Sequence, residues 1–455
     1  MEYTRELAKF CTGISYNALP EEVVHKAKLC LLDYAANVYG SLELDAVRAV
    51  TECVRAMGGP PDATALGCGF KTGLQNAAFV NGTTAEAIEA QDGLRFGGNH
   101  AVSAVIPAAL AVAEGRDLDG QRLIEAVVAG YETANRTAAA MHPFHTLSGF
   151  LPTGTCGTFG AAAAAARLMG LDKDGMLNAL GNAGYLLPLS MAEQLMGGYT
   201  IKIVQGGQAA SAGIMAAELA SRGISGSPVV LEGSALKGGF TQITLRADPK
   251  CERITDGLGE RYSIMDVYFK PYTACRHTHG AAQAVIELMG AHHFKPAAIR
   301  AITVFTYGVA ALAVGKGFAE SGTFVSAQFS IPFVVAACIL DGELGAKQLT
   351  ERRIADPALI TLSNKVTVVS DDELNKAYPD KTASRVEIVT HDGQRYVRQI
   401  DIPKGDPRDP MEQDDIAAKL RLFAGGRDAA KIDGIIEGIM NIEKAKGIGL
   451  LLGSI

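Results

Sequence analysis

Alanine and glycine dominate the helical stretches of the first 265 residues, and this limits how the chain can fold. The clearest case is the tract GAAAAAARLMG at residues 160–170, which Asp172 follows as a candidate helix N-cap. Asp119 can cap a second long helix through LIEAVVAGYETANRTAAAM. The distance between packed helices depends on the side chains at their contact, so small residues allow close approach. We therefore expect a tightly packed helical bundle.

The pattern changes near residue 266. Short β-rich runs occur at Ala301–Tyr307 and Val366–Val369, and the runs SRVEIVT and QRYVRQI flank an Asp392–Gly393 pair that favours a hairpin. A proline-rich connector, IPKGDPRDP, then precedes helical periodicity at Met411–Phe423. The prediction is a mainly α protein with a second α+β domain: a helical domain from residues 1–265 and 403–455, and a smaller α+β lid domain, 266–402, inserted between its parts.

Charge and cysteine pattern exclude several classes of protein. The formal net charge of −7 argues against a nucleic-acid partner, because nucleic-acid binders normally carry a basic field. The eight cysteines form no CxxC pair, which favours reduced thiols. The start MEYTRELAKF has no apolar signal region, and the longest apolar run, Ile331–Leu340, is too short to span a bilayer. We expect a cytoplasmic protein without a membrane partner.

The segment KPYTACRHTHG, residues 270–280, carries the densest group of cationic and titratable side chains. Lys270, Arg276, His277 and His279 stand there ahead of a helical stretch, AAQAVIELM. The N-terminus of a helix favours negative charge, and histidine can exchange a proton near neutral pH. This segment predicts proton chemistry on a small carboxylate, with Lys270, Arg276 and His277 as substrate-binding residues.

A second cluster precedes the apolar helix at GGNHAVSAVIPAAL. Glu89, Asp92 and Arg95 lie within twelve residues of His100, and together they could supply a base, its orienting partner and a substrate contact. A polar loop at a helix start explains the same pattern equally well. Lys202, in YTIKIVQGGQAASAG, could be a buried cation facing a carboxylate, but a snorkelling surface lysine is the more common outcome for such a motif.

Metal and nucleotide motifs are weak. His277 and His279 have H-x-H spacing without a third ligand at a conventional distance, and His142 and His145 are no more specific. The glycines at 154, 157 and 160 follow G-x-x-G-x-x-G, which suits helix packing rather than phosphate binding. We therefore expect neither a metal nor a cofactor.

Four ordered stretches together resemble the MmgE/PrpD family. They are SGFLPTGTCGTFGAAAAAARLMGLD, KPYTACRHTHGAAQAV, SAQFSIPFVVAACILDGEL and IPKGDPRDPM. The family includes 2-methylcitrate dehydratase, cis-aconitate decarboxylase and iminodisuccinate epimerase. The resemblance implies a homodimer, with an active site between a large helical domain and a smaller α+β lid. It also implies that no metal or organic cofactor is needed in the decarboxylase and epimerase branches.

The resemblance assigns several site residues. His100, Lys202 and His279 match the family's histidine after the acidic loop, its central lysine and its lid-domain histidine. The family's acidic motif, H-A-x-D-F-D-D, appears here as EAIEAQD at residues 86–92. Glu89 and Asp92 stand for two of its acids. Glu86 replaces its histidine and Gln91 its middle aspartate.

Three further positions depart from the family pattern. Leu151 stands where G-[FW]-H has its histidine, Gln205 replaces the histidine after the central lysine, and Phe333 replaces a tyrosine. Leucine and phenylalanine can neither transfer protons nor hydrogen-bond a carboxylate. We expect one wall of the pocket to be apolar, and a substrate with fewer carboxylates or with an alkyl or ring substituent.

The leading interpretation is an enzyme that removes or moves a proton next to a carboxylate. His100 and His279 would serve as base and acid, Lys202 and Arg276 would hold the carboxylate, and Glu89 or Asp92 would orient His100. A 2-methylcitrate-dehydratase-like hydro-lyase is favoured, with an epimerase or isomerase and a decarboxylase as alternatives. A non-catalytic carboxylate-binding protein also fits, since Leu151, Gln205 and Phe333 replace polar family residues.

Overall fold

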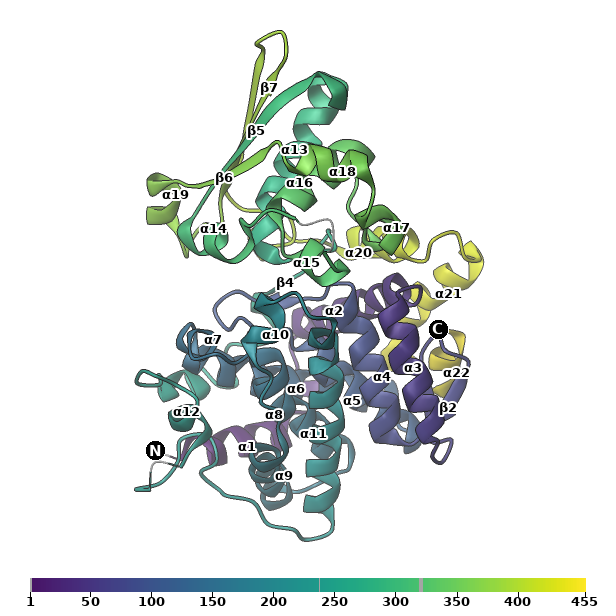
Figure 1. The fold of residues 1–455 in the computed structure, drawn as a ribbon. Helices are drawn as coiled ribbons and strands as arrows, with labels where there is room; N and C mark the ends of the chain where they lie inside the picture. Colours follow the sequence, from purple (N-terminus) through teal and green to yellow (C-terminus); the bar gives the residue numbers. More distant parts are fainter. Residues whose placement is uncertain (1, 237, 319–321) are drawn as a thin grey trace.

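The computed structural model describes residues 2–236, 238–318 and 322–455, and it has two stacked parts (Figure 1). A helical body forms the lower part in this view, and a sheet with its own helices forms the upper part. The prediction of a mainly α protein with a second, α+β domain is confirmed. Among the described residues no helix has both the length and the apolar character that crossing a bilayer requires.

The helical body is built mainly from the first half of the chain. Its helices are α1 (Tyr3–Gly13), α2 (Glu21–Ser41), α3 (Asp45–Met57), α4 (Leu74–Ala87), α5 (Val102–Gly115), α6 (Gly120–Met141), α7 (Phe144–Leu147), α8 (Pro152–Leu168), α9 (Lys173–Leu186), α10 (Ala192–Met196), α11 (Gln205–Ser221) and α12 (Phe240–Ile243). Both predicted caps are present: the carboxylates of Asp119 and Asp172 accept backbone N–H bonds at the starts of α6 and α9.

Glycines bring the central helices into backbone contact. A Cβ added to Gly160 of α8 would lie 2.6 Å from the carbonyl oxygen of Gly130 in α6, and one added to Gly130 would lie 2.9 Å from the carbonyl oxygen of Gly160. Helices α4 and α11 meet in the same way, because a Cβ on Gly82 would lie 2.7 Å from the Cα of Gly207. The predicted close helix packing is confirmed, and α6 and α8 cross where neither has a side chain.

The upper part contains a four-stranded sheet with the order β6-β5-β7-β8. Its strands are β5 (Ile299–Thr306), β6 (Val366–Ser370), β7 (Ser384–Thr390) and β8 (Arg395–Ile400). Strand β6 is parallel to β5, and the other pairs are antiparallel. The predicted hairpin joins β7 to β8, and Gly393 takes the positive φ of 87° that its turn requires.

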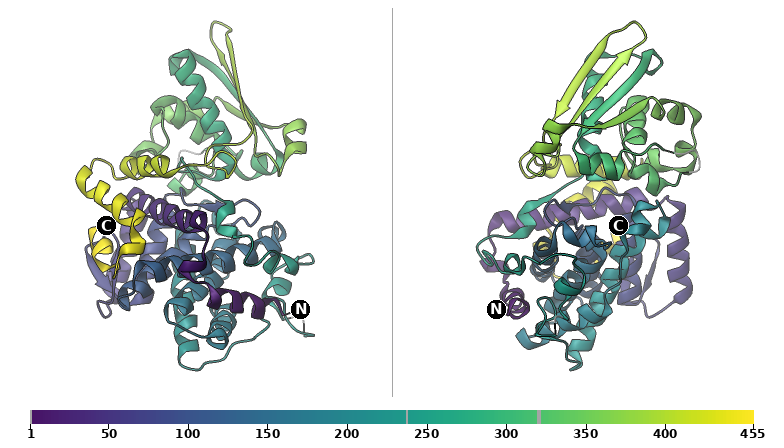
Figure 2. Two further views of the ribbon diagram at one scale, coloured as in Figure 1. Left: turned by 180° about the vertical axis from the view of Figure 1, so that it is seen from behind. Right: turned by 60° about the vertical axis from the view of Figure 1, so that its left-hand side comes forward.

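Helices pack against this sheet, with α13 on β7 and β8 and beside α16, which also contacts β6 (Figures 1 and 2). They are α13 (His279–His292), α14 (Gly308–Val314), α15 (Phe324–Gln328), α16 (Ile331–Asp341), α17 (Glu351–Ile354), α18 (Pro357–Ser363) and α19 (Asp372–Ala377).

The chain then returns to the helical body. The last helices are α20 (Gln413–Phe423), α21 (Ala429–Met440) and α22 (Gly449–Ser454). Helix α20 lies at the junction of the two parts and packs on α2, to which a buried ion pair between Lys419 and Asp33 joins it at 2.6 Å (Figure 2). The exact boundaries at 265/266 and 402/403 stay predictions.

Two small strand pairs were not predicted, because strands of two or three residues leave no periodic pattern. Strands β1 (Ala63–Ala65) and β2 (Phe70–Thr72) form one pair. Strand β3 (Gly93–Leu94) pairs antiparallel with the distant strand β4 (Val267–Tyr268), so that Gly93 lies opposite Tyr268. The second pair matters for the site, because it fastens the acidic loop after α4 to the segment that begins at Lys270.

Candidate active site

Buried charges gather where the loop after α4 meets the upper part. Glu86 lies in the last turn of α4, and Glu89 follows with a positive φ of 55°, which is uncommon for a residue with a side chain. This turn directs Glu89 toward two lysines. Lys202 pairs with Glu89 and lies 2.8 Å from Glu86, while Lys270 lies 2.6 Å from Glu89.

These four side chains form what we call the charge cluster: Glu86, Glu89, Lys202 and Lys270. Each side chain is at most 3% exposed, so their charges are stable only because each has an opposite partner. Burial alone would raise the pKa of Glu89, but Lys202 and Lys270 outweigh it and hold that pKa well below its ordinary value. Likewise burial would lower the pKa of Lys202, but Glu86 and Glu89 raise it. Lys202 is therefore a buried cation, and not the snorkelling surface lysine that its motif alone favoured.

His100 stands beside the cluster, just before α5. Its Nδ1 donates to the backbone carbonyl of Asp92, because a carbonyl oxygen can only accept. This contact fixes the tautomer and leaves the lone pair on Nε2, for which the described residues provide no hydrogen-bond donor. Gly93 makes room for the arrangement: a Cβ there would lie 2.9 Å from His100 Nδ1 and would collide with the hydroxyl of Tyr268.

Electrostatics keep this imidazole neutral. Burial, followed by the positive charge of Lys270, lowers the pKa of His100 to about 4, whereas Glu89 and Glu86 act in the opposite direction. His100 is therefore uncharged at neutral pH and able to accept a proton at Nε2. An anion bound near it would raise its pKa.

Asp92 does not orient His100 through its carboxylate, contrary to one of the predicted options. Its Oδ2 accepts from the Tyr131 hydroxyl at 2.6 Å, and its Oδ1 from the Val102 N–H at 3.4 Å, so the carboxylate is directed toward α5 and α6. Burial raises the pKa of Asp92 to about 7. The orienting contact is the backbone carbonyl instead, and Glu89 is engaged by the lysines.

His279 is enclosed. It has no exposed surface, its Nε2 donates to the carbonyl of Ala274 at 3.0 Å, and its Nδ1 faces Arg276 at 3.4 Å. Burial and the charge of Arg276 hold its pKa well below the ordinary value. Both ring nitrogens are thus occupied, and the predicted proton exchange between His100 and His279 has no open path in this structure.

Two arginines that were predicted to bind a substrate carboxylate donate to backbone carbonyls instead. Arg276 donates to the carbonyls of Pro403 and Lys404 at 2.7 and 2.8 Å, which ties the start of α13 to the connector before α20. Arg95 donates to the carbonyls of Pro379 and Asp380, at 2.6 and 2.7 Å, across the junction of the two parts. Neither guanidinium belongs to the charge cluster. A sequence motif shows that a side chain is positively charged, but it does not show which acceptors surround that side chain in the fold.

The remaining predicted residues divide between the cluster and the core. Gln205 donates from Nε2 to Glu86 at 2.7 Å, and its Oε1 accepts from the Ser190 hydroxyl at 3.1 Å. Leu151 lies next to Ser190, because its backbone N–H donates to the carbonyl of Ser190. His277, by contrast, contacts the hydroxyl of Tyr307 within the upper part.

Phe333 belongs to the interior of the upper part. It is fully buried in α16 and packs its ring against Phe318, with 4.9 Å between centroids. Its position is therefore explained by packing, and it lines no part of the charge cluster that these contacts describe.

Sequence reasoning missed two residues that hold the acidic loop. Gln328 of α15 donates to the carbonyl of Ala87 at 2.9 Å, and Lys419 of α20 donates to the carbonyl of Ala90. Lys419 also pairs with Asp33, which is fully buried. A signal was available, because both Asp33 and Lys419 interrupt the apolar faces of their helices. Charges in such positions are rarely buried unless they are paired.

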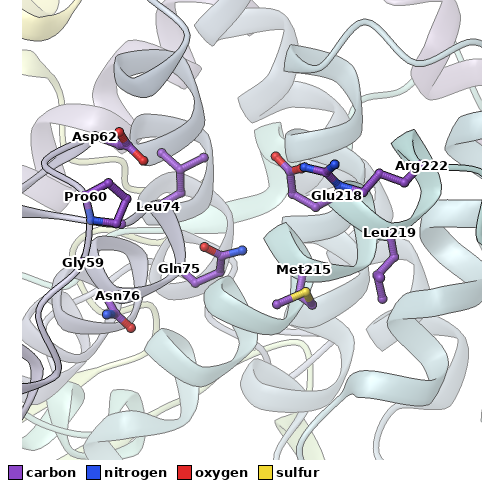
Figure 3. A pocket seen from close by; sticks show the side chains of 11 residues that line it. Gly59, Pro60, Asp62, Leu74, Gln75, Asn76, Met215, Glu218, Leu219 and Arg222 are labelled. Carbon is purple, nitrogen blue, oxygen red and sulfur yellow. The ribbon is translucent and has the colours of Figure 1, made fainter.

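Two surface pockets lie away from this site. A pocket of about 430 Å³ opens between the loop at 59–62, the start of α4 and the end of α11, with Met215, Glu218 and Arg222 on one side (Figure 3). A second, of about 480 Å³, lies between the end of α2, the segment 343–350 and the end of α20. Neither includes His100 or the charge cluster. Among the described residues no group of three His, Cys, Asp or Glu side chains is placed to hold a metal ion.

Comparison with protein families identifies the chain. The model of the MmgE/PrpD N-terminal domain matches residues 5–252, and that of the MmgE/PrpD C-terminal domain matches residues 272–440. The chain belongs to the MmgE/PrpD family. The family's C-terminal domain thus includes α20, although α20 packs in space against α2 of the N-terminal domain.

Curated relatives in the MmgE/PrpD family match nearly the whole chain. Cis-aconitate decarboxylase of Aspergillus terreus is 25% identical over 99% of this chain and 95% of its own length. The cis-aconitate decarboxylase-like protein oryM of Aspergillus oryzae is 27% identical over 99% and 97%. Human cis-aconitate decarboxylase is 24% identical over 98% and 93%.

Proposed function

We propose that this protein is a cofactor-independent lyase that acts on a small carboxylic acid by proton transfer next to a carboxylate. The observation that carries the proposal is His100, whose Nδ1 is fixed by the Asp92 carbonyl, whose lone pair is on Nε2, and whose pKa is lowered by burial and by the charges of two buried lysines. A fixed neutral imidazole next to cations is suited to remove a proton from a carbon made acidic by a bound carboxylate.

The cluster residues divide the work. Lys202 and Lys270 bind the substrate carboxylate and stabilise the enolate-like charge that develops as the proton leaves. Nε2 of His100 accepts that proton, and Glu86 and Glu89 stabilise the imidazolium, since both raise the pKa of His100. Because the nitrogens of His279 are occupied, we assign it, with Arg276, to holding the lid segment.

Dehydration is the reaction we favour. The carbon–hydrogen bond breaks toward His100, the imidazolium returns the proton to a β-hydroxyl, and that group leaves as water, so that an alkene forms. The alternative is a carboxy-lyase, in which CO₂ leaves and the carbon takes up a proton. The names of the relatives favour this alternative. Reprotonation of the same carbon would instead give an epimerase or isomerase.

One experiment separates these outcomes. The protein is incubated in D₂O with small hydroxy acids and with cis-aconitate, and the mixtures are followed by proton NMR. We expect alkene formation and its loss in His100→Gln. Release of CO₂ would favour the carboxy-lyase, and deuterium incorporation without a new product would favour the epimerase. A ligand that binds without any exchange would overturn the enzyme in favour of a carboxylate-binding protein.

The proposal includes a homodimer in the cytoplasm. Several large apolar side chains between α9 and α11 are exposed, and a second copy would cover them; they are Tyr185, Leu189, Met191, Met196, Tyr199 and Ile201. Sedimentation should give the mass of a dimer for the wild type and of a monomer for Leu189→Glu. A monomeric wild type would contradict the proposal.

A further inference from the structure

One oxygen of the charge cluster lacks a partner. Glu86 is fully buried, and its Oε1 accepts both from Lys202 at 2.8 Å and from the Gln205 amide at 2.7 Å. Its Oε2 is also buried, yet it has no hydrogen-bond partner among the described residues. Buried polar atoms are nearly always hydrogen-bonded, and an ionised oxygen without a donor is costly. This oxygen is therefore a vacant acceptor in the middle of the proposed site.

The structure around Glu86 keeps that oxygen available. Ser190 has a positive φ of 44° and donates its hydroxyl to Gln205 Oε1, which leaves the Gln205 NH₂ group directed at Glu86. Gly154 allows this turn, because a Cβ there would collide with the Ser190 hydroxyl. The amide thus occupies Oε1 and cannot rotate to Oε2 without losing its second bond.

Charge decides which donor fits. The cluster holds two lysines and two glutamates, so its charges already balance before a ligand binds. A ligand ammonium group would be repelled by Lys202 and Lys270, and every ligand carboxylate beyond the one that these lysines bind would be repelled by Glu86 and Glu89. A neutral hydroxyl meets neither obstacle and supplies the missing hydrogen.

We propose that Glu86 Oε2 accepts a hydrogen bond from a hydroxyl group of the ligand, so that this site prefers a hydroxy acid with few carboxylates. The inference rests on the proposed function, because it places the ligand carboxylate on Lys202 and Lys270. Lys270 and Gln328 come from the upper part and close over the acidic loop. Because Glu86 is fully buried, the inference requires this side to separate from the helical body before a ligand can enter.

Two departures from the family pattern are explained together. Glu86 and Gln205 each replace a family histidine in sequence, and here they contact each other directly. An anion with a paired amide in place of two imidazoles removes proton-transfer groups and adds an acceptor. Such a change alters what is bound rather than how the fold is held.

Calorimetric titration of three acids tests the inference: malate, succinate, which lacks only the hydroxyl, and cis-aconitate, which has a third carboxylate. Wild type should bind malate at least tenfold more tightly than succinate, as expected for a hydrogen bond to a charged group, and cis-aconitate more weakly than malate. Glu86→Gln should reduce the preference for malate, because a neutral amide oxygen accepts a weaker hydrogen bond than a carboxylate, and it should strengthen cis-aconitate binding, because it removes a negative charge.

Glu132→Gln is the matched control. Glu132 is a fully buried glutamate paired with Arg136, outside the charge cluster, and its variant should keep the wild-type ratio of malate to succinate. Glu86→Asp, which keeps the charge but withdraws the oxygens, should also lose the preference; it serves if circular dichroism shows that Glu86→Gln is unfolded.

Equal affinities of wild type for malate and succinate, or an unchanged ratio in the folded Glu86 variants, would overturn the inference alone. If none of the three acids bound to wild type or variants, the proposed function would fail with it.

Discussion

The crossing of α6 and α8 and the acidic loop after α4 are both buried, but they are stabilised in opposite ways. At the crossing, Gly130 and Gly160 bring two backbones together, with no polar side chain between them. At the loop, ionised side chains come from distant segments and form ion pairs with one another. Burial at the crossing is achieved by shape alone, whereas burial at the loop requires every charge to have a partner.

The backbone of the loop shows the same principle. Four of its carbonyls, at Ala87, Glu89, Ala90 and Asp92, are contacted by side chains; the donors are Gln328, Lys270, Lys419 and His100, respectively. These donors belong to the upper part, the C-terminal return and the segment just before α5. The loop can hold the strained Glu89 because the surrounding elements fix it, as is common at functional sites. We therefore expect changes at the loop to affect chemistry and stability separately, and changes at the crossing to affect stability alone.

The largest expected effect is on activity. His100→Gln removes the proton acceptor but keeps a polar group of similar size, so turnover should fall about 10²- to 10⁴-fold, the usual contribution of a general base. The melting temperature should change little. A variant with half the wild-type rate would show that His100 is not the base.

Lys419→Met should give the largest loss of stability. It leaves Asp33 buried without its cation and the Ala90 carbonyl without its donor. Breaking a buried pair costs about 3–5 kcal/mol, which urea unfolding can measure. Lys431→Met, at an exposed position of α21, is the control and should change almost nothing. Adding Asp33→Asn to Lys419→Met should recover part of the lost stability. A double variant no more stable than Lys419→Met would mean that the ion pair is not what holds α20 to α2.

Acid should lower the free energy of unfolding through two buried histidines, one beside the charge cluster and one in the upper part. Burial lowers the pKa of both His100 and His277 to about 4, so the folded chain keeps them neutral while the unfolded chain protonates them near pH 6.5. Their contribution is complete above about pH 6.5 and is lost as the pH falls toward 4, by roughly 1.4 kcal/mol per unit for each histidine. The pH dependence of unfolding should flatten in His277→Gln but not in His391→Gln, an exposed control. Equal slopes in all three proteins would contradict the assignment.

Sequence patterns predicted the parts of the fold that local chemistry determines. The caps at Asp119 and Asp172 and the turn at Gly393 depend on neighbouring residues only. The Gly- and Ala-rich sequences also predict close packing of their helices, because small side chains let two helix backbones approach each other. Short strands such as β3 and β4 escape prediction because their pairing partners lie far apart in sequence.

The candidate site was only partly predictable, for the same physical reason. The motifs identified His100, Lys202, Lys270 and Glu89, since charge and titratable groups are visible in sequence. They could not show that the acceptors around Arg276 are the carbonyls of Pro403 and Lys404, more than 120 residues away. Whether a cation is free for a ligand depends on such contacts.

The smallest expected effect tests the crossing itself. Gly160→Ala places a methyl group against the Gly130 carbonyl, a backbone atom that cannot move without shifting α6, so we expect a loss of about 1–3 kcal/mol in the free energy of unfolding. Gly434→Ala is the matched control, because nothing lies within 4 Å of a Cβ at this position of α21; relief of glycine's low helix propensity should stabilise it by up to about 1 kcal/mol. A lower free energy of unfolding for Gly160→Ala and a higher one for Gly434→Ala, both measured in urea, would support backbone contact between α6 and α8. Stabilisation by both substitutions would mean that the two helices are not packed as closely as described. The crossing would then have room for an alanine at position 160.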